Sequence, residues 1–216
     1  MSHEEIFVPE SLQAAAVVEA IRENGACARP MLREAFVASL LDEASRAPYR
    51  RGREVIGTGA AAVRQDLSYC EQFPTASLFR VLTRRFQALL EGRLGALDSY
   101  PFESPLVFND LMLQHYAAQG LGISAHRDET RYINLACIFV LEGGGGFYVC
   151  EDRQGRGAVE IVAPPGSAIF LRCPGLRAAS GRVFHYVAGL DAPRTTFGLR
   201  HDRKLEPGLE PAPVQH

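Results

Sequence analysis

The sequence has 216 residues, 47% of them hydrophobic, which allows one domain of ordinary size with a buried core and disfavours a disordered chain. Its 23 Lys and Arg against 25 Asp and Glu leave a net charge of −2, which disfavours nucleic-acid binding through a large basic surface. The five cysteines form no CxxC pair, so a disulfide scaffold and a thiolate zinc site are disfavoured. No apolar run reaches the roughly 18 residues of a membrane span. The start, MSHEEIFVPESLQ, has acids where a secretory signal is basic, and we expect a cytoplasmic protein.

The first hundred residues are predicted to be mainly helical. Ser11 suits a helix N-cap and Gly25 a helix stop, which predicts a first helix ending near Asn24. Pro30 stands where a second helix would take its first residue. Apolar residues at helical spacing then predict helices that end near residues 47 and 94, with a short strand over 26–29 between the first two.

Residues 50–70 differ from the helices around them, since three glycines interrupt them and short strands are expected at Val55-Ile56 and Val63. This segment begins with a basic run that contains Arg50, Arg51 and Arg53. The run is interpreted either as a solvated loop or as a substrate flap whose arginines meet a phosphate or a carboxylate.

From residue 106 onward the pattern changes to short β-rich runs separated by turn signals. The expected strands are 106–116, 134–141, 146–150, 159–162, 167–171, 182–187 and 195–200. Many short strands at regular spacing indicate a β-sandwich or barrel. We therefore expect an α+β fold in which N-terminal helices pack against an all-β core.

Three residues in the β-rich half have the chemistry of a metal site. His126 and Asp128 lie two residues apart, so on an extended chain both side chains point to the same face. His185 lies in a later β-like run, Arg-Val-Phe-His-Tyr-Val. Two histidines and one carboxylate form a facial triad, which leaves open positions on Fe(II). Such an iron can bind a bidentate 2-oxo acid and still accept O₂. His201, beside Asp202, is expected on the surface.

A 2-oxo acid with a second carboxylate needs a cationic anchor, and Arg194 is the candidate. A planar guanidinium suits bidentate carboxylate binding, and Thr196 shares its strand face two residues on. Arg200 follows on the same run and is interpreted as a second contact or as a surface ion-pair partner. Arg127, between two proposed ligands, points to the other face and is either structural or directed at a substrate.

These motifs resemble the Fe(II)/2-oxoglutarate-dependent dioxygenase superfamily, and the AlkB-like group in particular. The pieces that carry the resemblance are QHYAAQGLGISAHRD, RVFHY and RTTFGLR, within residues 106–202. The resemblance implies a double-stranded β-helix, or jelly roll. It implies iron ligands at His126, Asp128 and His185, and 2-oxoglutarate contacts at Arg194, Tyr116, Gln114, Thr196 and Arg200. Thr196 replaces the asparagine that the AlkB-like group has between its two arginines.

The sequence therefore predicts one oxygenase domain over residues 1–205, with helical support in 1–100, the jelly roll in 106–202 and a flexible tail in 206–216. Fe(II), 2-oxoglutarate and O₂ would be used to hydroxylate or oxidatively demethylate a C–H bond, with release of succinate and CO₂. A small organic or amino-acid-like substrate is favoured, and alkylated nucleic acid, with its base flipped out, is the alternative. From another class, a metal-binding jelly roll without catalysis stays open. The sequence leaves monomer and dimer undecided.

Overall fold

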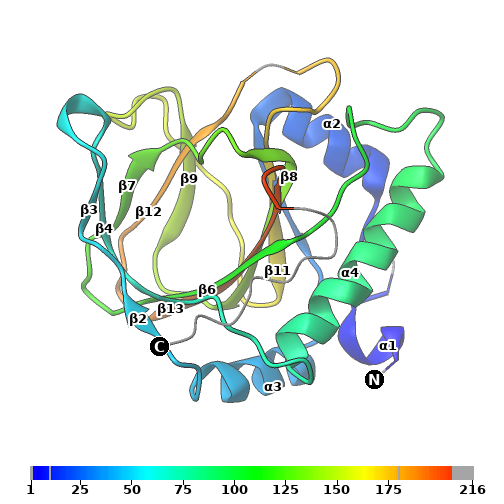
Figure 1. Ribbon diagram of the computed structural model, residues 1–216, viewed down its shortest axis with the longest axis horizontal. Helices are drawn as coiled ribbons and strands as arrows, with labels where there is room; N and C mark the ends of the chain where they lie inside the picture. The colour runs from blue at the N-terminus through cyan, green and yellow to red at the C-terminus, as the bar shows by residue number, and fades with distance from the viewer. Residues whose placement is uncertain (1, 10, 180, 206–216) are drawn as a thin grey trace.

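Two antiparallel sheets form the centre of the molecule. The computed structural model describes residues 2–9, 11–179 and 181–205 (Figure 1), so the predicted tail lies outside the described residues. The larger sheet has the order β1 (Ala26–Pro30), β11 (Ser167–Arg172), β8 (Tyr132–Glu142), β13 (Arg194–Asp202), β6 (Asp110–Tyr116), β5 (Ser68–Cys70) and β2 (Arg50–Arg51). The smaller sheet has the order β10 (Val159–Glu160), β9 (Gly146–Cys150), β12 (Phe184–Ala188), β7 (Gly122–His126), β4 (Val63–Asp66) and β3 (Val55–Ile56).

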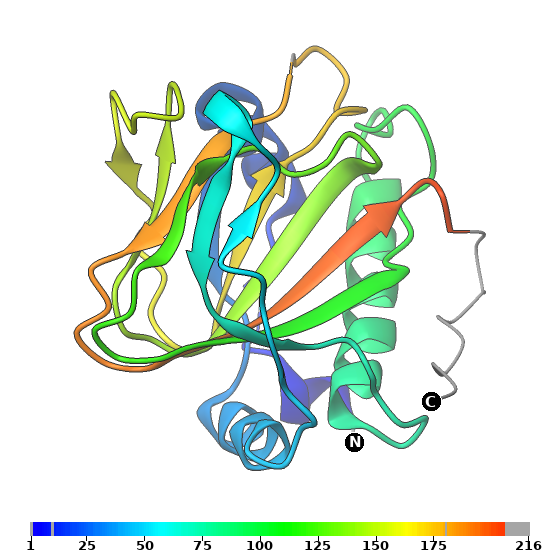
Figure 2. The ribbon, with the colours of Figure 1, turned by 60° about the vertical axis from the view of Figure 1, so that its left-hand side comes forward.

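The two sheets face each other as in a jelly roll, and the helices lie outside the larger sheet (Figures 1 and 2). The helices of the described residues are α1 (His3–Ile6), α2 (Ala14–Asn24), α3 (Glu34–Ala44) and α4 (Leu78–Gly95), with a 3-10 turn at Gly59–Ala61. Phe86 of α4 lies 4.9 Å from the ring of Phe139 in β8 and 6.2 Å from that of Phe170 in β11. One apolar cluster therefore joins helices and sheet.

The central strands β8 and β11 are buried on both faces. In β8, Cys137 and Phe139 belong to the core under the helices, whereas Ala136 and Val140 belong to the core between the sheets. Because successive strand residues point to opposite faces, two cores require a continuous apolar run. The run in β8 is YINLACIFVLE. The larger sheet thus packs against the helices on one face and against the smaller sheet on the other, which is consistent with the predicted β-sandwich of the second half.

The predicted helix starts were wrong at two places. Pro30 ends β1, where it pairs with Ser167, and α3 begins only at Glu34. The first long helix begins at Ala14 after Gln13, and Ser11 is not its cap. In both cases a residue that suits a helix start lies in the extended chain before the helix. For Pro30 the reason is that its fixed φ is equally compatible with an edge strand.

Residues 50–70 pass from one sheet to the other. β2 pairs with β5, which pairs with β6, and β3 pairs with β4, which pairs with β7. The strands at Val55-Ile56 and Val63 are present, whereas β2, β5 and β7 were not among the predicted strands. They are short or glycine-bearing, so their pairing depends on neighbours from distant parts of the chain. No helix in the described part of the chain is long and apolar enough to cross the bilayer.

Candidate metal centre

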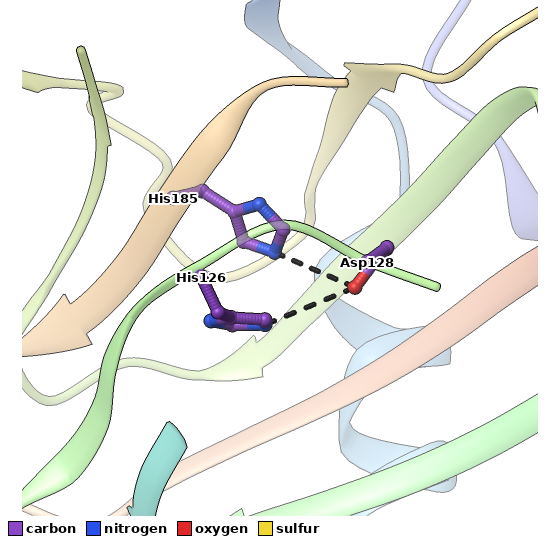
Figure 3. A group of neighbouring side chains, drawn as sticks. All are labelled: His126, Asp128 and His185. Carbon is purple, nitrogen blue, oxygen red and sulfur yellow. Dashed lines mark ion pairs between the residues drawn. The ribbon is translucent and has the colours of Figure 1, made fainter. Parts of the chain in front are cut away.

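Adjacent strands bring the two predicted histidine ligands together. His126 ends β7 and stands directly opposite His185 in β12, so their rings lie 4.4 Å apart between centroids. Asp128 follows β7 by two residues and turns toward both rings (Figure 3). Gly122 begins β7, and its backbone approaches Val187 so closely that an added Cβ would lie 2.1 Å from the Val187 carbonyl oxygen. Glycine at this position therefore lets β7 pair closely with β12.

Three ligand atoms converge on one point. The Asp128 Oδ1 atom lies 3.8 Å from His126 Nε2 and 3.7 Å from His185 Nε2. With metal–ligand bonds of about 2.1 Å, neighbouring ligand atoms on a six-coordinate ion are about 3 Å apart. The Asp128 Oδ1 atom therefore needs to move closer to each histidine nitrogen by less than an ångström to share an ion with it. One ligand atom from each of the three residues lies within 4.8 Å of the other two.

The backbone orients both imidazoles for this purpose. His126 Nδ1 lies 2.9 Å from the carbonyl oxygen of Ser124, and His185 Nδ1 lies 3.2 Å from that of Val183. An Nδ1–H that donates to a carbonyl leaves an Nε2 lone pair free for a metal. Burial first, and the neighbouring His185 second, lower the pKa of His126 to about 4. His126 is thus held neutral, as a metal ligand must be.

The Asp128 carboxylate lies in a cationic setting. Burial alone would raise its pKa, but the neighbouring groups, His185 and Arg200 first among them, outweigh burial and bring the pKa below its usual value. The Arg200 Nε atom lies 3.8 Å from Asp128 Oδ2, and Arg182 donates a hydrogen bond of 2.6 Å to the Asp128 carbonyl oxygen. Arg200 is therefore an internal partner of a proposed ligand, and the surface interpretation of Arg200 was wrong.

The predicted co-substrate residues line one cavity with the triad. Arg194 pairs in register with Tyr116, and Thr196 with Gln114, because β13 lies beside β6. All four side chains, together with Arg200, face the cavity that His126, Asp128 and His185 also line. Ile123, Ile138, Phe147 and Val187 complete its walls with apolar groups. The sequence analysis did not select these four, since nothing distinguishes them from ordinary core residues.

Arg194 is buried, with 2% of its surface exposed, and it has weak partners. Its guanidinium approaches the carbonyl oxygens of Gly144 and Gly145 at 3.4 and 3.3 Å, and its Nε atom has no partner among the described residues. Burial lowers its pKa, as expected for a cation without a nearby acid. A buried cation of this kind is costly unless an anion binds it. The donor set therefore fits iron and a 2-oxo acid carboxylate.

The basic run of residues 50–53 is placed differently. Arg50 pairs with Glu71 at 2.7 Å, and Arg51 pairs with Asp66 at 2.9 Å, so both charges are already neutralised. Arg53 is exposed and lies outside the triad cavity. Whether this segment acts as a substrate flap stays a prediction. Arg127 turns away from the ligands, as expected, and places its guanidinium 4.1 Å from the ring of Phe184.

Two further histidines are not ligands. His115 faces the other side of β6, where its Nδ1 contacts the hydroxyl of Thr195 at 3.1 Å. His201 was predicted to lie on the surface, and this was wrong because the side chain is buried. Its Nδ1 lies 3.1 Å from the amide nitrogen of Asn134. Alternation along β13 turns residue 201 away from the triad cavity and toward the loop before β6.

Solved structures share this fold. A prolyl hydroxylase from Trichoplax adhaerens, in complex with a hypoxia inducible factor peptide fragment, is 15% identical with a TM-score of 0.64, over 87% of this chain and 88% of that one. The α-ketoglutarate-dependent epimerase SnoN from nogalamycin biosynthesis is 18% identical with a TM-score of 0.60, over 93% and 92%. A 2OG-Fe(II) oxygenase family oxidoreductase from Burkholderia pseudomallei is 17% identical with a TM-score of 0.59, over 88% and 90%.

At these identities the likeness shows the fold, the jelly roll of Fe(II)/2-oxoglutarate oxygenases. It gives no support to the narrower AlkB-like resemblance. No protein-family model and no curated protein matches the sequence. The activity must therefore be argued from the site.

Proposed function

We propose that the protein is an Fe(II)- and 2-oxoglutarate-dependent oxygenase that hydroxylates or oxidatively demethylates a C–H bond of a small organic or amino-acid-like molecule. The observation that carries this proposal is the convergence of His126 Nε2, His185 Nε2 and Asp128 Oδ1 in a cavity that also contains the buried guanidinium of Arg194. A structural ion alone would explain the triad, but it would leave Arg194 buried without an anion.

In this proposal each side chain has one task. His126, His185 and Asp128 would hold Fe(II), and Arg194 would bind the far carboxylate of 2-oxoglutarate, beside the hydroxyls of Tyr116 and Thr196. When bound, iron and 2-oxoglutarate would supply, with O₂ as the oxidant, the oxidation that releases succinate and CO₂. The apolar walls of the cavity exclude water and strengthen the attraction between the guanidinium and the carboxylate.

The first test is an anaerobic titration of the metal-free protein with Fe(II) and 2-oxoglutarate, followed by the visible metal-to-ligand charge-transfer band. We expect a saturable band in the wild type and none in His126→Ala. Arg93→Gln is the matched control, because Arg93 is an exposed residue near the end of α4 and outside the cavity. A wild-type protein that is folded and metal-free yet gives no band would overturn the proposal.

Succinate release with candidate substrates separates catalysis from passive metal binding. A metal-binding jelly roll without catalysis would bind Fe(II) but give no 2-oxoglutarate band and no succinate. Competition by a methylated single-stranded oligonucleotide tests the nucleic-acid alternative. The near-neutral charge of the chain and the ion pairs of Arg50 and Arg51 favour the small molecule.

A further inference from the structure

Two arginines outside the triad cavity lie where two other cavities meet. Arg172 and Arg182 line a small cavity together with Asp128 and His185. Both also line an open cavity of about 460 Å³ that reaches the surface. Val183, two residues before His185, is the third residue that the two cavities share. The arginines thus stand between the surface and the proposed metal ligands.

Arg172 forms no ion pair with a carboxylate among the described residues. It ends β11, and its NH1 group donates to the carbonyl oxygen of Arg22 at 2.7 Å, at the end of α2. Its Nε atom is buried and has no partner among the described residues. Burial lowers its pKa, and no nearby carboxylate offsets that shift. Carbonyl oxygens satisfy part of the guanidinium but do not neutralise its charge.

Arg182 repeats this pattern from the segment just before β12. Its NH1 group donates to the backbone carbonyl of Asp128 at 2.6 Å, and within the described residues it forms no ion pair with a carboxylate. Arg127 adds a third positive charge to the outer cavity, with its guanidinium held over the Phe184 ring. These cations differ from Arg50 and Arg51, whose charges are neutralised by neighbouring acids.

The acidic residues that line these two cavities do not pair with Arg172 or Arg182. Glu23 and Glu151 line only the outer cavity and are absent from the inner one. Glu129 lines the inner cavity but pairs with Arg131 at 3.2 Å. The Asp128 carboxylate turns to the two histidines. The residues that the two cavities share therefore include two guanidinium groups, and neither forms an ion pair with a carboxylate among the described residues.

We propose that Arg172 and Arg182 bind an oxyanion group, a carboxylate or a phosphate, of the small-molecule substrate and direct its reacting carbon toward the metal ligands. Planar guanidinium groups bind such groups through paired hydrogen bonds, and partial burial strengthens each bond. The inference rests on the proposed oxygenase function and adds the chemical class of the substrate. It also moves the expected substrate contact away from the basic run at residues 50–53.

The test measures anion binding without turnover. The metal-free full-length protein is titrated with inorganic phosphate and, separately, with acetate, at an ionic strength held constant with sodium chloride, and the thermal unfolding midpoint is followed. We expect a saturable stabilisation whose apparent Kd rises at least about tenfold in Arg172→Gln and in Arg182→Gln. Arg194 is itself proposed to bind a carboxylate, so the titrations are repeated in Arg194→Gln, where any response that remains belongs to the other cavities. Arg93→Gln is again the control for surface charge.

Arg172→Lys guards against a folding defect, since it keeps a donor for the α2 carbonyl groups but loses the planar fork. It should fold and bind phosphate more weakly than the wild type. An identical phosphate response in the wild type, Arg172→Lys and Arg182→Gln would overturn the inference. Competition by a single-stranded oligonucleotide at a concentration a hundredfold below that of phosphate would overturn it in favour of a nucleic-acid substrate. A normal Fe(II)–2-oxoglutarate band in the same samples shows that the proposed function stands independently.

Discussion

Replacing Arg194 by Gln should separate co-substrate affinity from stability. The side chain is buried, and it makes only long contacts to two glycine carbonyl groups. A bound carboxylate would gain two charge-assisted hydrogen bonds of about 1.5 kcal/mol each. Losing about 3 kcal/mol raises the Kd for 2-oxoglutarate about a hundredfold. The free energy of unfolding without ligand should change by less than about 1 kcal/mol, because the guanidinium is buried without a counter-ion.

Both quantities come from one pair of assays. Urea unfolding of metal-loaded protein, with 2-oxoglutarate at a hundred times the wild-type Kd, should show about 2.7 kcal/mol of stabilisation in the wild type. Arg194→Gln should show about 0.4 kcal/mol under the same conditions. The charge-transfer titration gives the Kd values directly. An unchanged Kd in a folded Arg194→Gln protein would refute the assignment of Arg194 as the carboxylate anchor.

Two further predictions concern the scaffold. Gly122→Ala places a Cβ 2.1 Å from the Val187 carbonyl oxygen, at a φ of +77°, so we expect a loss of about 3 kcal/mol in urea unfolding and weaker Fe(II) binding. Gly189→Ala is the control with a similar φ of +70° and open space around it, and an equal loss in both variants would contradict the close-contact argument. For His201, burial lowers the pKa, so the folded state binds a proton less readily than the unfolded state does. The resulting stability is present above the unfolded pKa of about 6.5 and is lost as the pH falls below it. His201→Asn keeps an acceptor for the Asn134 amide and removes this titration. The urea midpoint of the variant should therefore change less between pH 7.5 and pH 5.5 than that of the wild type. An equal pH dependence of the two midpoints would contradict this account.

The candidate site was predicted more completely than the elements that carry it. The spacing of His126 and Asp128 is local, so an extended backbone suffices to place both side chains on one face. The chemistry of two imidazoles and a carboxylate then indicates the kind of metal without knowledge of the fold. The start of α3 was missed because Pro30 is compatible with both a helix start and an edge strand, and pairing with Ser167 decided for the strand.

The roles of the arginines depend on the tertiary structure. In the sequence, Arg50 and Arg51 are as plausible substrate contacts as Arg172 and Arg182, since none of the four has an acidic residue directly beside it. The fold brings Glu71 and Asp66 to the first pair and leaves the second pair beside the proposed metal ligands. Charge neutralisation falls steeply with distance, so only three-dimensional proximity distinguishes a paired arginine from an available one.

The sequence by itself predicted the residue types of the proposed triad, the β-rich second half and Arg194 as the proposed anchor, because these follow from side-chain chemistry and from the period of two along a strand. The tertiary structure decided which strands are neighbours. It placed His185 opposite His126, and β13 beside β6, through hydrogen-bonded pairing between segments far apart in the chain. Such pairing is settled by the burial of both faces of the central sheet, and no single segment contains that information.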